Sequence, residues 1–203
     1  LFEGAIMHRD SLGYEQRIVP GDVNWMTAGH GIVHSECSPD DERDRARDLH
    51  GIQTWIALPR GDERTDPAFA HHPKTALPVK QWPNAELRLI AGTGWGLKAP
   101  AKIFSPMFYA AITTSSTAQF DLPPEHAERA IYVVDGAVAV DGTVIAPHTV
   151  AVFESGMPVT VNTTSAARIM AFGGAAMDGD RFILWNFVAS SRELIEDARN
   201  RWR

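Results

Sequence analysis

The sequence is poor in cysteine, and Cys37 is the single one among its 203 residues. One cysteine excludes an internal disulfide framework and is typical of the reducing cytoplasm, which is where we expect this protein. Long apolar runs are also absent, since none approaches the roughly 20 residues of a membrane-spanning helix. The opening segment, LFEGAIMHRD, lacks the basic and apolar regions of a signal peptide. We therefore expect no membrane association.

An excess of positive charge is missing as well. The chain carries 19 lysines and arginines against 25 aspartates and glutamates, which gives a net charge of −6. A protein of this charge has no general attraction to phosphate backbones, so we expect no direct nucleic-acid partner. The sequence also contains neither a dinucleotide-binding fingerprint nor the nucleophile elbow of a serine hydrolase. Nothing in it supports either of those enzyme classes.

Short apolar runs separated by turn residues dominate the chain, which is the pattern of an all-β sandwich or barrel. Asp135-Gly136 and Asp141-Gly142 stand between such runs and predict hairpin turns. The predicted strands include residues 52–58, 87–91, 108–112, 131–134, 137–140, 149–153 and 168–172.

A single helix is predicted, at the end of the chain. Ser190 and Glu193 have the spacing of a capping box, in which each side chain bonds the backbone N–H of the other residue. The residues that follow place an apolar stripe on one helix face, and we expect this face to pack on the β core. The stripe consists of Leu194, Ile195, Ala198 and Trp202.

An internal repeat divides the chain in two. LFEGAI at 1–6 parallels VVDGAV at 133–138, and PGDV at 20–23 parallels PHTV at 147–150. Such self-similarity indicates two copies of one β unit. We therefore predict two tandem antiparallel β-barrels or jelly rolls joined near residues 92–106. The first would span residues 1–100, and the second would span 101–203 and include the helix.

His34 and Glu36 are the candidate metal ligands of the first barrel. Residues i and i+2 of a strand point to the same face, so both side chains would project together. An imidazole and a carboxylate suit a divalent first-row metal, and the alternative is a His–Glu pair joined by a hydrogen bond. The repeat aligns Val161 with His34 and Thr163 with Glu36, so the second barrel lacks this pair.

Other residues are candidates for the surroundings of this site. Trp25 and Met26 are expected in the core, with the alternative that they wall a cavity for an aromatic substrate, because they precede the site closely. His50 opens the predicted strand HGIQTWIAL and either faces the cavity or is a core histidine with its hydrogen bonds satisfied. His8 lies where a strand runs into a turn, and we expect it to be exposed. Trp55 is expected in the core.

Four segments together resemble the pirin family, in a bacterial-type branch. They are HRDSLG, IVPGDVNWMTAGHGIVHSE, LHGIQTWIALP and FILWNFVASSRELIEDARNRW. Pirins are bicupins of the cupin superfamily, with a metal held by three histidines and one glutamate in the N-terminal barrel. The resemblance maps the third histidine onto His34 and the glutamate onto Glu36. The other two histidines are expected upstream of Leu1, in a His-Pro-His segment, so we interpret the chain as N-terminally truncated.

The resemblance also implies a function. Several pirins are similar to quercetin 2,3-dioxygenases, which open the flavonol ring with O2 and release carbon monoxide. The implied cofactor is one divalent metal, Fe(II) first, with Ni, Mn, Cu, Co or Zn as alternatives, and Glu36 would be the catalytic base. Without the upstream histidines the metal and the activity are in doubt. The alternative is a non-enzymatic regulator that senses iron redox state and binds a transcription factor or metabolic enzyme. We expect a monomer.

Overall fold

The computed structural model describes residues 1–44 and 48–202 and confirms the all-β prediction. Its strands are accompanied by one α-helix in the described part of the chain, at its C-terminal end. No helix among these residues is both long and apolar enough to cross a membrane. The chain divides into two compact units. The first consists of Leu1–Lys74 and Met177–Arg203, and the second of Thr75–Ala176.

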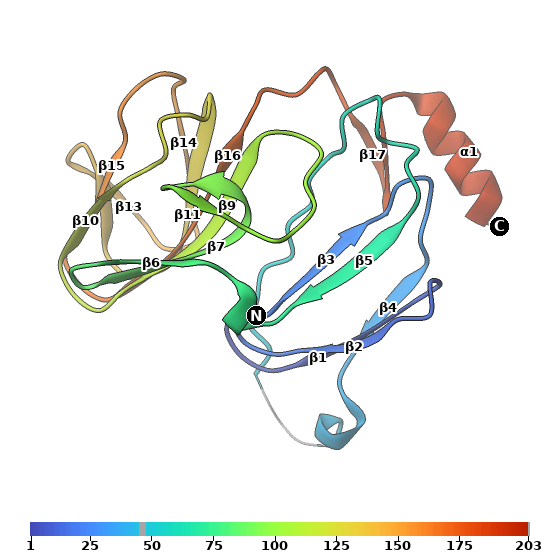
Figure 1. The fold of residues 1–203 in the computed structure, drawn as a ribbon, viewed down its shortest axis with the longest axis horizontal. Coiled ribbons are helices and arrows are strands. Elements are labelled where there is room, and N and C mark those ends of the chain that lie inside the picture. The colour runs from blue at the N-terminus through green and yellow to red at the C-terminus, as the bar shows by residue number, and fades with distance from the viewer. Residues whose placement is uncertain (45–47, 203) are drawn as a thin grey trace. The chain divides into compact units, whose positions relative to one another are not determined.

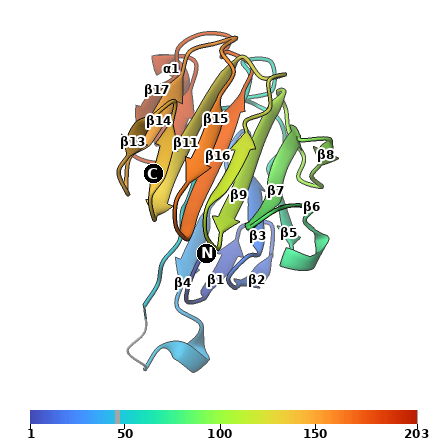
Figure 2. The same ribbon diagram turned by 90° about the vertical axis from the view of Figure 1, so that its left-hand side faces the viewer.

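The second unit is built from two antiparallel sheets. One has the order β14-β11-β16-β9-β7-β6, with β8 added to β7, and the other has the order β10-β15-β12-β13 (Figures 1 and 2). Its strands are β6 (Val79–Trp82), β7 (Ala85–Gly94), β8 (Leu97–Lys98), β9 (Met107–Thr114), β10 (Ala118–Asp121), β11 (Glu128–Asp135), β12 (Val138–Val140), β13 (Thr143–Ile145), β14 (Val150–Phe153), β15 (Thr160–Thr163) and β16 (Ala167–Gly174). A short 3-10 helix, η2 (Lys74–Ala76), precedes them.

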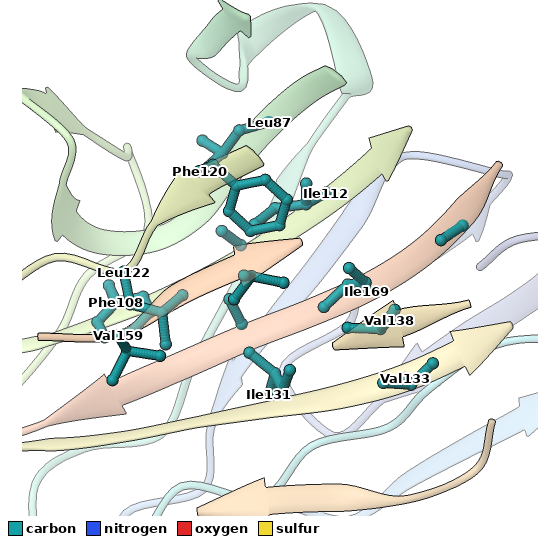
Figure 3. Packing of buried hydrophobic residues seen from close by; sticks show 14 of the residues in the cluster. Leu87, Phe108, Ile112, Phe120, Leu122, Ile131, Val133, Val138, Val159 and Ile169 are labelled. Atoms are coloured by element: carbon teal, nitrogen blue, oxygen red, sulfur yellow. The ribbon is translucent and has the colours of Figure 1, made fainter. Parts of the chain in front are cut away.

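A continuous apolar core fills the space between these two sheets. Figure 3 shows Phe120 of β10 beside Ile112 of β9, and Val138 of β12 beside Ile169 of β16, so side chains of the two sheets meet in this core. Alternate residues of β7, such as Leu87 and Leu89, have no exposed surface, as expected for the buried face of a strand. A cluster of buried apolar side chains therefore occupies the space between the two sheets of the second unit.

The first unit contains smaller sheets. Their orders are β2-β1-β4, β3-β5 and β17-β18 (Figure 1). The elements are β1 (Ile6–Asp10), β2 (Glu15–Ile18), β3 (Val23–Thr27), β4 (His34–Cys37), the 3-10 helix η1 (Asp40–Glu42), β5 (Ala68–His72), β17 (Phe182–Leu184), β18 (Phe187–Ala189) and α1 (Arg192–Trp202).

The repeat is visible in the strand order of the two units. β1 lies between β2 and β4 in the first unit, as β12 lies between β13 and β15 in the second. Val161 and Thr163, the predicted counterparts of His34 and Glu36, lie in β15 and are buried. The second copy thus has no metal-binding side chain at these two positions.

The division of the chain differs from the predicted boundary at residue 100. β7 continues through residue 94 and pairs with β8 and β9, so the expected join at 92–106 lies inside the second unit. Helix α1 belongs to the first unit, where it packs on β17 and β18, and Arg201 Nη1 donates to the carbonyl oxygen of His30 at 3.0 Å. The last segment returns to the first unit because its apolar stripe and arginine find partners there.

Two local predictions need correction. Residues 51–59 form no strand, because apolar composition alone makes no strand where none of the described strands pairs with the segment. Trp55, which we expected in the core, lies in this segment and is 53% exposed. The helix cap is shifted by one residue. The backbone N–H of Leu194 donates to Ser191 Oγ at 3.3 Å, whereas Ser190 Oγ donates to Glu63 at 2.7 Å.

The two predicted turns have different roles. Asp141 and Gly142 have φ angles of 48° and 77° and connect β12 to β13 as a two-residue hairpin, as predicted. Asp135 and Gly136 make no hairpin, since β11 and β12 belong to different sheets. Asp135 instead accepts a hydrogen bond from the backbone N–H of Arg168 at 3.0 Å.

Candidate metal centre

The candidate site lies on one face of the β2-β1-β4 sheet. His34 and Glu36 are alternate residues of β4 and share this face, as strand alternation predicts. Across the antiparallel pair, Glu36 lies opposite His8 and His34 lies opposite Asp10. Directly opposed residues project to the same side of a sheet, so two imidazoles and two carboxylates meet here.

His8 is the buried member of this group, with 2% of its surface exposed, contrary to the prediction that it is exposed. Its Nε2 lies 3.0 Å from Asp10 Oδ2, and the Asp10 side chain has no exposed surface. Its Nδ1 lies 3.9 Å from Glu36 Oε1. The His8 ring therefore has one carboxylate in hydrogen-bond contact and a second one just beyond it.

Three rings form a stack across the site. His8 stacks on Phe69 of β5 with centroids 4.3 Å apart and planes 8° apart. On the same sheet face, His8 also stacks with His34 at 5.7 Å and 23°. Tyr14 adds a tilted contact to Phe69 at 5.1 Å. The β3-β5 sheet thus covers His8, while His34 stays at the exposed end of the stack.

Asp10 is held in its ionised form. Burial raises the pKa of its carboxyl, but hydrogen bonds from His8 and from the backbone N–H groups of Tyr14 and Leu12 outweigh this effect and leave the pKa below its ordinary value. An ionised carboxylate only accepts hydrogen bonds. We therefore assign a proton to Nε2 of His8, which donates to Asp10 Oδ2, and Nδ1 is the ring nitrogen that faces Glu36.

The donor types at this site suit a divalent metal, but the number of donors is small. His34 and Glu36 offer an imidazole nitrogen and carboxylate oxygens on an exposed strand, which are ordinary ligands of first-row metals. Within residues 1–44 and 48–202, no group of three or more histidine, cysteine or acidic side chains is arranged to hold a metal ion. The described residues therefore do not form a complete metal site by themselves.

The predicted pocket residues are only partly brought together. Met26 lies opposite Phe69 in the β3-β5 pair and shares its sheet face, which is the face that contacts His8. Trp25 is the neighbour of Met26 in β3 and points to the other face. His50 lies elsewhere in the unit, where it forms an isolated bridge with Glu3 and an edge contact with the Phe2 ring at 5.0 Å.

Sequence reasoning missed His8 and Asp10. The signal was the spacing H-x-D at the end of a predicted strand, which is the same i, i+2 pattern that identified His34 and Glu36. A strand pattern says which residues share a face but not which strands become neighbours. The pairing of β1 with β4 was therefore invisible in the sequence.

Comparison with known proteins gives consistent similarities. Residues 1–56 match the family described as Pirin, and residues 109–203 match the Pirin C-terminal cupin domain. A pirin-like protein of Caulobacter vibrioides is 42% identical over 204 residues, which covers the whole chain and 70% of the relative. These sequence similarities extend over both units of the fold.

Solved structures show the same fold. A quercetin 2,3-dioxygenase from Acinetobacter baumannii matches with a TM-score of 0.89 at 31% identity, over 99% of this chain and 66% of that one. A bacterial pirin from Escherichia coli, solved in complex with nickel(II), matches with a TM-score of 0.67 at 21% identity, over 86% of this chain and 70% of that one. The chain thus spans about two thirds of the length of these proteins.

The sequence matches and the shared bicupin architecture agree with each other and with the repeat of the β unit. The chain belongs to the pirin family.

Proposed function

We propose that the protein, with a complete ligand set, is a metal-dependent dioxygenase of the quercetin or flavonol type. The observation that carries this proposal is the shared exposed face of His34 and Glu36, in a chain 31% identical to a quercetin 2,3-dioxygenase. The overall reaction would add O2 to a flavonol, open its central ring and release one ring carbon as carbon monoxide.

His34 and Glu36 would hold the metal in this proposal, together with ligands that the described residues do not supply. Fe(II) is the proposed metal, with Ni, Mn, Cu, Co and Zn as alternatives, because imidazole and carboxylate donors accept all of these ions. When bound, the metal supplies Lewis acidity that favours loss of the proton from the flavonol hydroxyl.

Glu36 is the proposed acceptor of that proton. Its side chain is 38% exposed, so it can turn toward a substrate that approaches from solvent. Met26 lies on the facing β3-β5 sheet and offers an apolar, deformable surface for a flat aromatic ring. His8, which stacks with both Phe69 and His34, has only 2% of its surface exposed, so this inner side of the site would be shielded from water.

Metal content and oxygen uptake test the proposal. We expect full-length protein loaded with Fe(II) to consume O2 and release an equal amount of carbon monoxide when quercetin is added. Elemental analysis of the same sample establishes the metal content. Protein with stoichiometric iron but neither O2 uptake nor carbon monoxide release would exclude the dioxygenase and favour the regulator that binds a protein partner.

A further inference from the structure

We propose that His8 is a positioning residue for the His34–Glu36 pair. It would hold the His34 ring by stacking and confine the Glu36 carboxylate, while Asp10 and Phe69 hold His8 itself. This inference rests on the proposed metal centre, because its consequence is the strength with which His34 and Glu36 bind a metal.

The first support is the number of contacts that fix His8. Phe69 covers one ring face at 4.3 Å in a nearly parallel stack, and Asp10 Oδ2 accepts from Nε2 at 3.0 Å. A ring fixed at a face and at an edge can neither flip nor tilt without losing one of these contacts. His8 therefore presents its other face and its Nδ1 edge in one orientation.

The second support is what that orientation faces. The His8 ring also stacks with His34, with centroids 5.7 Å apart, and its Nδ1 lies 3.9 Å from Glu36 Oε1. Both partners are exposed side chains on β4, which would otherwise sample several rotamers. The 3.9 Å separation exceeds a hydrogen bond, so His8 limits the space available to the Glu36 carboxylate without bonding to it directly.

The third support comes from the second copy of the β unit. In the second copy, Val138 pairs with Thr163 and Val140 pairs with Val161, which are the counterparts of Glu36 and His34, so valines stand at the positions of His8 and Asp10. Both valines are buried and belong to the apolar core of that unit. The same strand position can thus be filled by a valine, so packing alone does not require an imidazole.

Burying an imidazole is costly unless its polar atoms have partners. Asp10 supplies one partner and is in turn fixed by the backbone N–H groups of Leu12 at 2.9 Å and Tyr14 at 3.1 Å. The copy that has the His34–Glu36 pair has both His8 and Asp10, and the copy without the pair has neither. Side chains that orient metal ligands commonly contribute 10- to 100-fold in metal affinity, which is the size of effect to expect here.

Titration with Co²⁺ tests this role, because the visible absorption of Co²⁺ reports the geometry of its ligands. Full-length wild-type protein is compared with His8→Ala, which removes the ring, and with His8→Phe, which keeps a flat ring but loses both nitrogens. We expect His8→Ala to lower the Co²⁺ affinity about 10- to 100-fold and to shift the absorption band. His8→Phe should lose less affinity and still show an altered band.

His126→Phe is the matched control. His126 is a buried histidine of the second unit, with one hydrogen bond from its ring to the carbonyl oxygen of Thr93 at 2.8 Å and a ring contact with Phe108 at 5.0 Å. This variant loses a comparable hydrogen bond and should bind Co²⁺ as the wild type does. Thermal unfolding of all variants identifies any that fail to fold. If His8→Ala fails to fold, the test is the comparison of His8→Phe with the wild type.

Folded His8 variants with wild-type affinity and absorption would overturn the positioning role. Wild-type protein that binds no Co²⁺ would overturn the metal centre together with it. Wild-type protein that binds Co²⁺, responds to the His8 substitutions and takes up no O2 would overturn the dioxygenase alone. A second readout needs no metal, since ¹⁵N NMR should find the His8 proton on Nε2, and a proton on Nδ1 alone contradicts the assigned orientation.

Discussion

A Cβ atom added to Gly92 would lie 1.8 Å from the carbonyl oxygen of Met107, so β7 and β9 approach each other at this point as only glycine allows. Gly92 also has a φ angle of +76° and follows a register shift between the two strands. This glycine therefore belongs to the sheet of the second unit and is not part of a linker, which is how the glycine-rich stretch around it was interpreted from sequence.

Gly92→Ala should destabilise the second unit by about 2–5 kcal/mol, which combines the left-handed backbone cost with an overpacking cost. Gly96→Ala is the matched control, because Gly96 has a φ of +77° and nothing within 4 Å of an added Cβ. Gly96→Ala should lower the free energy of unfolding only by the cost of the left-handed backbone, about 1–2 kcal/mol. Urea unfolding followed by tryptophan fluorescence measures both, and equal losses would show that the close approach is absent.

Ser191 and Ser190 should respond differently to substitution. Ser191→Ala removes the cap of α1 and should cost about 1 kcal/mol of unfolding free energy, chiefly through fraying of the helix. Ser190→Ala removes the hydrogen bond from its hydroxyl to Glu63 and leaves the helix capped. Hydrogen exchange of the backbone amides in the first helical turn distinguishes the two variants, and we expect faster exchange in Ser191→Ala only. Faster exchange in Ser190→Ala only would show that Ser190 is the cap, as predicted from sequence.

The all-β class and the repeat could be predicted because they follow from local patterns. Apolar runs of strand length, broken by turn residues such as Asp141-Gly142, are visible in any window of the sequence. The shared face of His34 and Glu36 follows from alternation in the same way. These features need no knowledge of which strands become neighbours.

The features that were missed depend on contacts distant in sequence. His8 is buried because β1 pairs with β4 and because Phe69 of β5 covers its ring. Residues 52–58 have strand-like composition but form no strand in the structure. Helix α1 belongs to the first unit because it packs on β17 and β18 and because Arg201 bonds to His30. His30 lies more than 150 positions earlier in the sequence than Arg201. Local pattern carries none of this information.

Acid should weaken the first unit through Asp178. The hydrogen bond from Arg181, together with the backbone N–H of Arg60 at 2.8 Å, lowers the pKa of this carboxyl below its unfolded value. The folded state therefore binds this proton less readily than the unfolded state. The resulting stabilisation is fully present above the unfolded pKa and disappears as the pH falls through the folded pKa.

Asp178→Asn tests this pH dependence, because it keeps the shape of the side chain and removes the titration. The variant should be less stable than the wild type at neutral pH, and the difference should shrink as the pH falls below the ordinary range of an aspartate pKa. The measurement is the free energy of unfolding as a function of pH. A difference that stays constant with pH would show that Asp178 contributes through hydrogen bonds alone.

Metal binding in the full-length protein should depend on His34. His34→Ala removes the imidazole of the candidate pair, so we expect it to abolish stoichiometric metal, measured by elemental analysis after purification. Binding by the wild type should weaken at acid pH, since an imidazole must be unprotonated to bind a metal. His148→Ala is a suitable control, because His148 is an exposed histidine of the second unit, 3.4 Å from the Tyr132 hydroxyl. Unchanged metal occupancy in His34→Ala would show that the centre lies elsewhere, whereas loss in both variants would indicate nonspecific histidine binding.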